Sequence, residues 1–209
     1  MKLSRKFVSD YVDIPDNITI KDLAEAMTGI GNEYDSCGKL INATNLVVGE
    51  VIECINHPDS DHLHVCMVDV GKSEAIQIVC GAPNVREGLK VIVSLPGAVL
   101  PGNFEIKKGK IRGVESNGMI CALYELGLEE KNDETYAKGI EELNSDAKVG
   151  EDPIKYLGLD DTLYELDIHK HRNNDCYYHI GFAYEIGAIL NRRVVLPQDS
   201  FKEVNDSIN

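Results

Sequence analysis

Aromatic residues are scarce in this sequence, which has no tryptophan and only 6% phenylalanine and tyrosine among its 209 residues. Between Leu40 and Leu123, Phe104 is the only aromatic side chain, so this stretch offers few platforms on which nucleic-acid bases could stack. Long apolar runs are also missing, and the N-terminus lacks the apolar stretch of a signal peptide. We therefore expect no membrane span, no signal peptide and a cytoplasmic location.

Motifs that would carry catalysis or bind a nucleotide phosphate are absent as well. The sequence contains neither a GxxxxGKS or GxxxxGKT loop nor a GxSxG elbow. No two of its six cysteines stand three positions apart, which excludes a CxxC metal or redox pair. Several cysteines lie in apolar runs, which is typical of core thiols in a reducing compartment. We expect no catalytic residue and no cofactor within this segment.

Positive charge is in short supply, with 21 Lys and Arg against 35 Asp and Glu and a net charge of −14. This balance argues against a simple nucleic-acid-binding chain, and we expect no DNA partner. The charge is unevenly spread, however. Residues 40–123 hold seven basic and nine acidic residues, whereas residues 124–167 hold four basic and fourteen acidic ones. The acidity therefore belongs mainly to the second of these stretches.

Both ends of the chain carry helical patterns. Ser4 and Thr19 are suited to cap two helices that end before residue 31, and Asp22 lies in the first turn of the second helix. Near the other end, residues 163–168 alternate like a strand, and Asp175 is placed to cap a helix through Leu190. Between these flanks, the polar residues 129–138 are expected to be mobile.

The middle of the chain changes to the two-residue period of β-strands. Five short runs separated by Gly and Pro turns fit a small closed barrel of the OB type, namely residues 47–54, 63–70, 75–80, 89–93 and 117–121. The sequence therefore predicts an α+β fold in which an OB-fold barrel is inserted into a small α+β domain. We expect residues 1–39 to form the first part of that domain, and residues 40–150 the barrel with an acidic extension. Residues 151–209 would complete the domain and begin a following linker or domain of a longer parent chain.

Four stretches resemble the tRNA-binding OB module of several synthetases and free tRNA-binding proteins. They are HPDSDHLHVC (57–66), QIVCGAPNV (77–85), LPGAVLPG (95–102) and KIRGVESNGMIC (110–121). The flanks, above all residues 23–33 and 156–168, resemble the N-terminal region of the bacterial phenylalanyl-tRNA synthetase β subunit. Two departures stand out. HKHRNNDC (169–176) is one residue longer than the family's usual segment and lacks its proline, and His62 replaces the family's usual basic residue.

The resemblance implies an α2β2 enzyme that attaches phenylalanine to its tRNA with ATP and Mg²⁺. In that family the α subunit carries the aminoacylation site, and the metal ligands and editing pocket of the β subunit lie beyond the equivalent of residue 209. The resemblance thus implies an inactive fragment of an enzyme, with weak tRNA binding and with the α subunit as a partner through the rest of the β chain. Two alternatives stay open: a free-standing tRNA-binding protein or chaperone, and a structural spacer that no longer contacts RNA.

The candidate RNA-binding residues form one basic cluster, Lys107, Lys108, Lys110 and Arg112, to which the resemblance adds His62. Lys108, Lys110 and Arg112 alternate, so on a strand they would share one face and could follow a phosphate backbone. The alternative is a solvated edge strand that its lysines protect from aggregation. At His62, a histidine is mostly neutral at pH 7, which would weaken a phosphate contact.

A zinc site is the other chemistry considered, since His62, His64 and Cys66 alternate and His57 is close in sequence. Ligands at alternate positions of one strand diverge instead of surrounding an ion, so we expect no metal site there. A second histidine group, at 169, 171 and 179, is a weaker zinc candidate, and its alternative is a polar turn with an exposed helix position.

Overall fold

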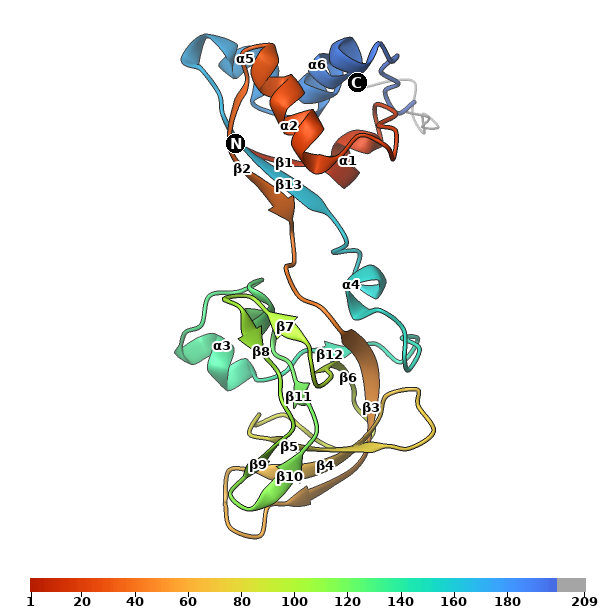
Figure 1. The fold of residues 1–209 in the computed structure, drawn as a ribbon, viewed down its shortest axis with the longest axis vertical. Helices are drawn as coiled ribbons and strands as arrows, with labels where there is room; N and C mark the ends of the chain where they lie inside the picture. Colours follow the sequence, from red (N-terminus) through yellow and green to blue (C-terminus); the bar gives the residue numbers. More distant parts are fainter. Residues whose placement is uncertain (199–209) are drawn as a thin grey trace, which may run out of the picture. The chain divides into compact units, whose positions relative to one another are not determined.

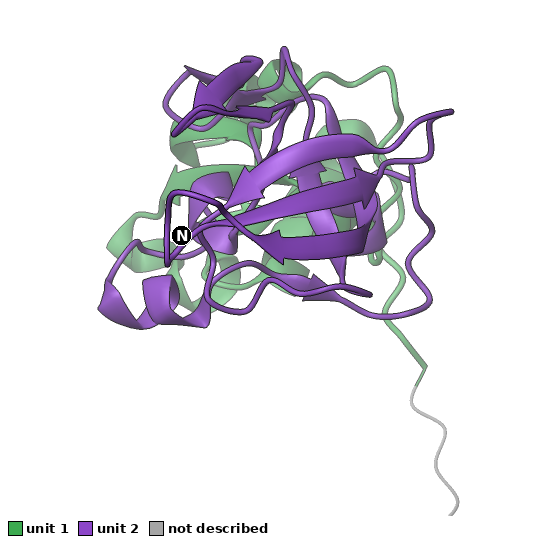
Figure 2. Ribbon diagram, turned by 90° about the horizontal axis from the view of Figure 1, so that it is seen from below, with its two compact units in different colours: residues 1–39, 161–209 green, residues 40–160 purple. Residues whose placement is uncertain are grey.

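The computed structural model describes residues 1–198. The chain divides into two compact units, one built from Met1–Lys39 together with the chain from Asp161 onward, and the other from Leu40–Asp160 (Figure 2). The central unit therefore ends at Asp160 and not at residue 150 as we expected. The reason is that the short helix near residue 155 packs with the barrel, where Tyr156 and Leu157 contact its second core cluster.

The flanking unit is a three-stranded antiparallel sheet with helices packed on it (Figure 1). The strand order is β1-β13-β2, so the strand from after the barrel lies between the two from before it. Its elements are β1 (Lys2–Ser4), α1 (Arg5–Ser9), α2 (Ile20–Gly29), β2 (Glu33–Lys39), β13 (Thr162–Asp167), η2 (Lys170–Arg172), α5 (Asn173–Cys176) and α6 (His179–Leu190). Strands β1 and β2 were not predicted.

The two predicted N-terminal caps are confirmed. The hydroxyl of Ser4 accepts a hydrogen bond from the backbone N–H of Phe7 at 2.9 Å. Thr19 and Asp22 form a reciprocal capping box, in which each side chain accepts the other's backbone N–H at 3.1 and 3.2 Å. Each cap satisfies N–H groups that have no partner within the helix. Because a cap involves only neighbouring residues, the starts of these two helices could be predicted from the local sequence alone.

The predicted cap at Asp175 is wrong. Asp175 lies in the separate short helix α5, and α6 begins after Tyr178, whose side chain makes no capping hydrogen bond. The carboxylate of Asp175 instead accepts from Nε of Arg172 at 2.8 Å. The backbone passes so close to Gly181 that a Cβ there would lie 1.7 Å from the Asp175 carbonyl oxygen. The contact with Gly181 thus sets the break between the helices.

The core of the flanking unit lies between the sheet and the helices. On β13, Tyr164 and Leu166 are buried while Glu165 and Asp167 are exposed, as expected for a strand with one covered face. Helix α6 contributes the predicted apolar stripe of Phe182, Ala183 and Ile186, all fully buried. Residues from before and after the barrel therefore build one hydrophobic core.

The central unit is an antiparallel barrel sheet of order β11-β6-β3-β4-β5, in which β12 also pairs with β6. The five predicted strands are confirmed, as is the α+β fold class with an OB-type barrel. Its elements are β3 (Leu46–Asn56), β4 (His64–Asp69), β5 (Ile76–Cys80), β6 (Lys90–Ser94), β7 (Val99–Leu100), β8 (Phe104–Glu105), β9 (Gly109–Ile111), β10 (Val114–Ser116), β11 (Met119–Ile120), η1 (Leu123–Leu126), α3 (Asp133–Lys138), β12 (Glu142–Leu143) and α4 (Pro153–Tyr156). The small hairpins β7–β8 and β9–β10 were not predicted.

Individual hydrogen bonds bring β5 against the segment that leads into β11 and so nearly close the barrel. The backbone N–H of Asn117 donates to the carbonyl of Gln77 at 2.8 Å, and that of Val79 donates to the hydroxyl of Ser116 at 3.1 Å. Gly118 lets the same segment lie close to the end of β6, because a Cβ there would lie 2.8 Å from the carbonyl oxygen of Ser94. Two apolar clusters fill the unit, one inside the barrel and one under η1 and α4.

The acidic segment after the barrel is more ordered than its composition suggested. Residues 129–138, which we expected to be mobile, contain helix α3, and Asn132 caps it by accepting the N–H of Thr135 at 2.9 Å. Lys138 in its last turn pairs with Glu129 and Glu141 at 3.0 and 3.3 Å. These local contacts stabilise a short helix that the polar composition alone did not indicate.

Candidate nucleic-acid interface

Two loops of the barrel come together at one end. In chain order the barrel strands are β3, β4, β5, β6 and β11, so residues 57–63 connect the first two and residues 95–118 connect the last two. In OB folds these two connections flank the surface that binds oligonucleotides. We call them the first loop and the long loop. His62 lies in the first loop, and the whole basic cluster lies in the long loop.

The long loop carries the hairpin β9–β10, whose turn is formed by Arg112 and Gly113. Their φ angles are +45° and +85°, the left-handed pair of a two-residue hairpin turn. Arg112 is therefore a turn residue, Lys110 lies on β9, and Lys108 precedes the strand. The prediction that Lys108, Lys110 and Arg112 share one strand face is thus wrong, because the chain reverses direction at Arg112.

Hydrogen bonds tie the hairpin to the first loop. Nε2 of His57 lies 3.2 Å from the carbonyl oxygen of Ile111, and Nδ1 of the same ring accepts the N–H of Asp59 at 3.1 Å. Since Nδ1 accepts, Nε2 must carry the proton and donate it to Ile111. Arg112 adds a third link by donating from Nη1 to the carbonyl of Asp59 at 3.0 Å. His57 is only 3% exposed, so its two hydrogen bonds are largely shielded from water, whereas the contact between Arg112 and Asp59 is exposed.

The three lysines of the long loop are exposed. Lys107 pairs with Glu105 at 3.0 Å, an exposed pair that contributes little and that a phosphate could replace. Lys108 and Lys110 are exposed and form no ion pair with any residue in the range 1–198. His62 is also exposed and lies 3.5 Å from Asp61. The structure gathers the four cations on one loop and leaves His62 on the other, beside an acid.

Sequence reasoning missed the part played by His57. We considered it only as a neighbour of a zinc site, whereas both of its ring nitrogens are occupied by the loop contacts. His62 is exposed on the loop and Cys66 is fully buried, so these side chains do not converge. Within the part of the chain that the structure describes, no three His, Cys, Asp or Glu side chains are grouped to hold a metal ion.

The weaker histidine group is also dispersed. His169 and His171 stack with ring centroids 5.7 Å apart. His179 instead accepts the backbone N–H of Ser4 at Nε2, at 3.1 Å, and contacts the ring of Phe7. Burial lowers the pKa of His179, which agrees with a neutral ring that accepts a hydrogen bond.

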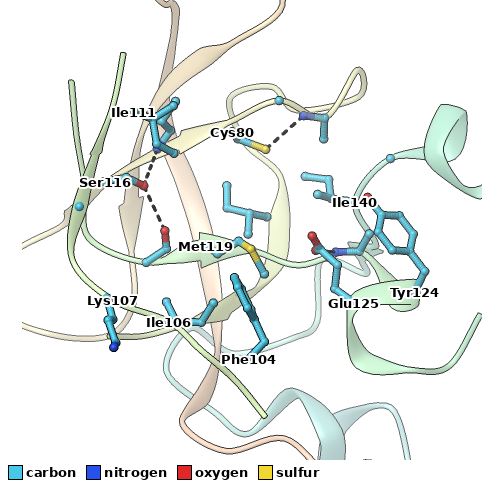
Figure 3. Close-up of a pocket in the computed structure, with 18 of the residues that line it drawn as sticks. Cys80, Phe104, Ile106, Lys107, Ile111, Ser116, Met119, Tyr124, Glu125 and Ile140 are labelled. Carbon is cyan, nitrogen blue, oxygen red and sulfur yellow. Dashed lines mark hydrogen bonds between the residues drawn. The ribbon is translucent and has the colours of Figure 1, made fainter. Parts of the chain in front are cut away.

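A pocket of about 410 Å³ opens beside the long loop (Figure 3). Phe104, Ile106 and Met119 contribute apolar surface, and Lys107 and Lys110 also belong to its lining. Further lining comes from the end of β5, from η1 and from α3, including Cys80, Tyr124, Glu125, Tyr136 and Ile140. Local sequence patterns did not signal this pocket, because its walls come from segments up to sixty residues apart.

Burial changes the acid–base properties of several pocket groups. It raises the pKa of the Glu125 carboxyl, an effect partly offset by the backbone N–H of Ala122, which donates to that carboxylate at 2.8 Å. Burial also raises the pKa of Tyr124, and it raises the pKa of the Cys80 thiol to about 11. The Cys80 thiol is therefore a poor nucleophile at neutral pH.

The central unit, Leu40–Asp160, contains a match to a known protein family. A family model described as "Putative tRNA binding domain" matches residues 46–152, which is about half of the chain. The chain belongs to this tRNA-binding domain family. The matched residues include the first loop, the long loop with its basic cluster, and the pocket. The residues that the structure brings together are thus all part of the family's domain.

Curated relatives cover the tRNA-binding domain and both flanks. The phenylalanine–tRNA ligase beta subunit of Geobacillus kaustophilus is 47% identical over 211 aligned positions, covering 100% of this chain and 26% of the relative. That of Bacillus subtilis is 44% identical over 208 positions, covering 99% of this chain and 26% of the relative. The match is to the N-terminal part of these subunits, so the chain spans about a quarter of their length. Among solved structures, a MetRS-related protein from Pyrococcus horikoshii matches at 24% identity and a TM-score of 0.36, over 50% of this chain and 84% of that chain.

None of the helices within residues 1–198 has the length and apolar character needed to cross a bilayer. The longest, α6, has twelve residues.

Proposed function

We propose that this chain is the non-catalytic N-terminal part of a phenylalanine–tRNA ligase β subunit, and that its barrel contacts tRNA through the long loop. The observation that carries the proposal is the junction of the two barrel loops. His57 and Arg112 hold the hairpin against the first loop, so Lys107, Lys108 and Lys110 project from an anchored segment. An anchored group of cations loses less conformational entropy on binding than a free tail would.

Phosphates are the expected partners of these side chains. Lysines release counterions from the RNA backbone when they bind, which gives salt-sensitive and sequence-indifferent affinity. The excess of acidic residues after Tyr124 opposes the approach of RNA and keeps the binding weak. Arg112 contributes less directly than its charge suggests, because one of its guanidinium nitrogens is engaged by the carbonyl of Asp59.

The proposal also covers the longer subunit, and the enzyme, to which this chain would belong. Because the relatives are named ligase β subunits, we assign the parent chain to an α2β2 enzyme of the cytoplasm whose α subunit carries the aminoacylation site. ATP and Mg²⁺ would act in those other parts. We expect this chain alone to show no phenylalanine-dependent pyrophosphate exchange, and exchange above a no-enzyme control would contradict its non-catalytic role.

The test is filter binding of tRNA at several salt concentrations. The variant Lys108→Glu with Lys110→Glu reverses two exposed charges and leaves the Arg112 contact intact. Its matched control is Lys72→Glu with Lys155→Glu, which makes the same charge change at exposed lysines of the same unit outside both loops. For the parent we expect a slope of log K against log salt between about −2 and −3, as for three or four phosphate contacts.

The result separates the proposal from the spacer alternative. The loop variant should lose most of its tRNA affinity, and the control should keep nearly all of it apart from a small effect of net charge. Equal binding by the parent and the loop variant would mean that this loop is not the RNA site. Such a result would favour a structural spacer. A free-standing tRNA-binding protein is the weaker alternative, because the β-subunit relatives match the flanks as well as the barrel.

A further inference from the structure

The pocket beside the long loop is not explained by phosphate binding. Its volume of about 410 Å³ falls within the 300–1,000 Å³ typical of small-molecule sites. It combines an apolar wall with a few polar groups, which is the usual composition of a site that orients one flat ligand. Two of the cluster's lysines, Lys107 and Lys110, belong to its lining, so a nucleotide bound by them would have its base within reach of the pocket.

Phe104 is placed to stack on such a base. Phe104 is 59% exposed although it lies beside apolar neighbours, and in Figure 3 its ring is directed toward Met119. An exposed aromatic ring next to cations is the arrangement with which proteins hold single-stranded nucleic acid. A base that covered the ring would remove its apolar surface from water, and the thioether of Met119 would supply a second soft contact.

Glu125 provides a polar group that can distinguish bases. One carboxylate oxygen, Oε2, accepts the N–H of Ala122 at 2.8 Å. No other hydrogen bond to this side chain is found among residues 1–198, and the side chain is only half-buried. An ionised carboxylate can only accept hydrogen bonds, so it selects a ligand edge made of N–H donors.

We propose that this pocket binds one unpaired nucleobase of an RNA and prefers guanine. Guanine presents its N1–H and 2-amino donors side by side, which matches the acceptors of the Glu125 carboxylate. The other three bases place an acceptor beside each donor on the corresponding edge, and that acceptor would face the carboxylate unfavourably. Phe104 stacks on the base, and Lys107 and Lys110 hold the flanking phosphates. The proposal deepens the proposed RNA-binding function and rests on it.

Mononucleotides test the pocket directly. The ¹⁵N-labelled 209-residue chain is titrated with GMP, IMP, AMP and UMP, and the amide signals of the lining glycines Gly81, Gly118 and Gly139 are followed by NMR. GMP should shift these signals at the lowest concentration. IMP lacks the 2-amino group and should bind about ten-fold more weakly, because one hydrogen bond to a charged acceptor is lost.

Two variants assign the roles. Phe104→Ala should weaken all four nucleotides by about five-fold or more, the loss expected for one stacked base. Glu125→Gln keeps an oxygen for the N–H of Ala122 but replaces acceptor capacity by a donor, so it should remove the preference for GMP over IMP. Phe7→Ala is the matched control, because Phe7 is also half-exposed but lies in the other unit. It should change nothing.

Filter binding of tRNA by the same proteins distinguishes this proposal from the one it rests on. Shifts at other sites only, equal affinity for the four nucleotides, or no effect of Phe104→Ala would overturn the base pocket. If salt-sensitive tRNA binding persists in that case, the phosphate contacts stand without a base site. Pocket shifts with the predicted order, but no tRNA binding, would support the nucleotide site and overturn the proposed tRNA contact.

Discussion

His57 and Ile111 are joined by a 3.2 Å hydrogen bond although 54 positions separate them in sequence. The bond runs from a buried imidazole in the first loop to a backbone carbonyl in the hairpin of the long loop. Together with the contact between Arg112 and Asp59, it determines where the basic cluster is held. The geometry of the candidate interface therefore depends on a buried residue whose two ring nitrogens are both engaged within the protein.

Replacing His57 tests this dependence. His57→Ala removes a buried ring and leaves the N–H of Asp59 and the carbonyl of Ile111 without their partner. We expect the free energy of unfolding to fall by about 1–3 kcal/mol and tRNA affinity to fall with it, since the hairpin loses an anchor. Urea unfolding and filter binding measure the two effects. His62→Ala, in the same loop but exposed, should leave the unfolding curve unchanged, and equal destabilisation by both would contradict the role given to His57.

Asn84 anchors the acidic extension by pairing with Ile140 in both directions. Its Nδ2 donates to the Ile140 carbonyl at 2.9 Å, and its Oδ1 accepts the Ile140 N–H at 3.0 Å. Asn84→Asp would remove the donor and place a second carboxylate beside Glu142. We expect faster limited proteolysis of residues 129–141. We also expect the free energy of unfolding to fall by about 1–3 kcal/mol. Asn132→Asp is the control, because aspartate caps a helix as well as asparagine does. Unchanged cleavage of Asn84→Asp would show that the extension is held elsewhere.

The flanking unit should lose stability in mild acid through His179. Burial lowers its pKa in the folded state, and the neutral ring accepts the N–H of Ser4. The unfolded chain therefore binds the proton more readily, and unfolding becomes more favourable as pH falls. The stabilisation is complete above the unfolded pKa of about 6.5 and is lost as pH falls through the lower folded value.

Chemical unfolding from pH 8 to pH 5 checks this. His179→Gln removes the titrating group. The free energy of unfolding of this variant should therefore depend less on pH just below pH 6.5 than that of the parent. Carboxylates that titrate at lower pH, such as Glu142, whose pKa is lowered by its hydrogen bonds with Arg86, should be unaffected by that change. An identical pH dependence in the parent and in His179→Gln would rule out the histidine as its source.

Excision of the barrel should leave a folded flanking unit. Lys39 at the end of β2 is paired with Thr162 at the start of β13, so these strands are already neighbours where the barrel leaves and returns. Replacing residues 40–160 by Asn-Gly would join them through the three-residue loop Asn-Gly-Asp161, a length found in β-hairpins. Circular dichroism and proteolysis should show a cooperative fold. An unfolded remnant would mean that the flanks need the barrel.

Local features of the sequence were sufficient for much of the fold. The caps at Ser4 and Thr19 were predictable because a cap involves residues three positions apart. The five barrel strands followed from their alternating apolar pattern and from the glycines and prolines between them. Asp175 shows where such reasoning fails. Its position fits a cap, but the ion pair with Arg172 and the contact between the backbone and Gly181 end one helix and begin another.

The candidate site likewise has some features that could be predicted from the sequence and others that only the structure revealed. The basic cluster could be found from sequence because its members lie within six positions of one another. Their arrangement could not, because the left-handed turn at Arg112 takes that residue off the strand. No sequence pattern singled out Glu125 as a candidate site residue. Its importance comes from a half-buried position beside Phe104 and Met119, and those residues reach it only through the folding of the barrel.

By itself the sequence determined the helix caps at Ser4 and Thr19, the strand periods, the family motifs and the location of the positive charge, because each depends on residues that are close along the chain. Only the tertiary structure decided that β13 lies between β1 and β2, that His57 holds Ile111, and that a pocket forms between η1 and the long loop. These depend on contacts between residues many tens of positions apart. Such contacts depend on how separate elements pack, and no local pattern of side chains encodes that packing.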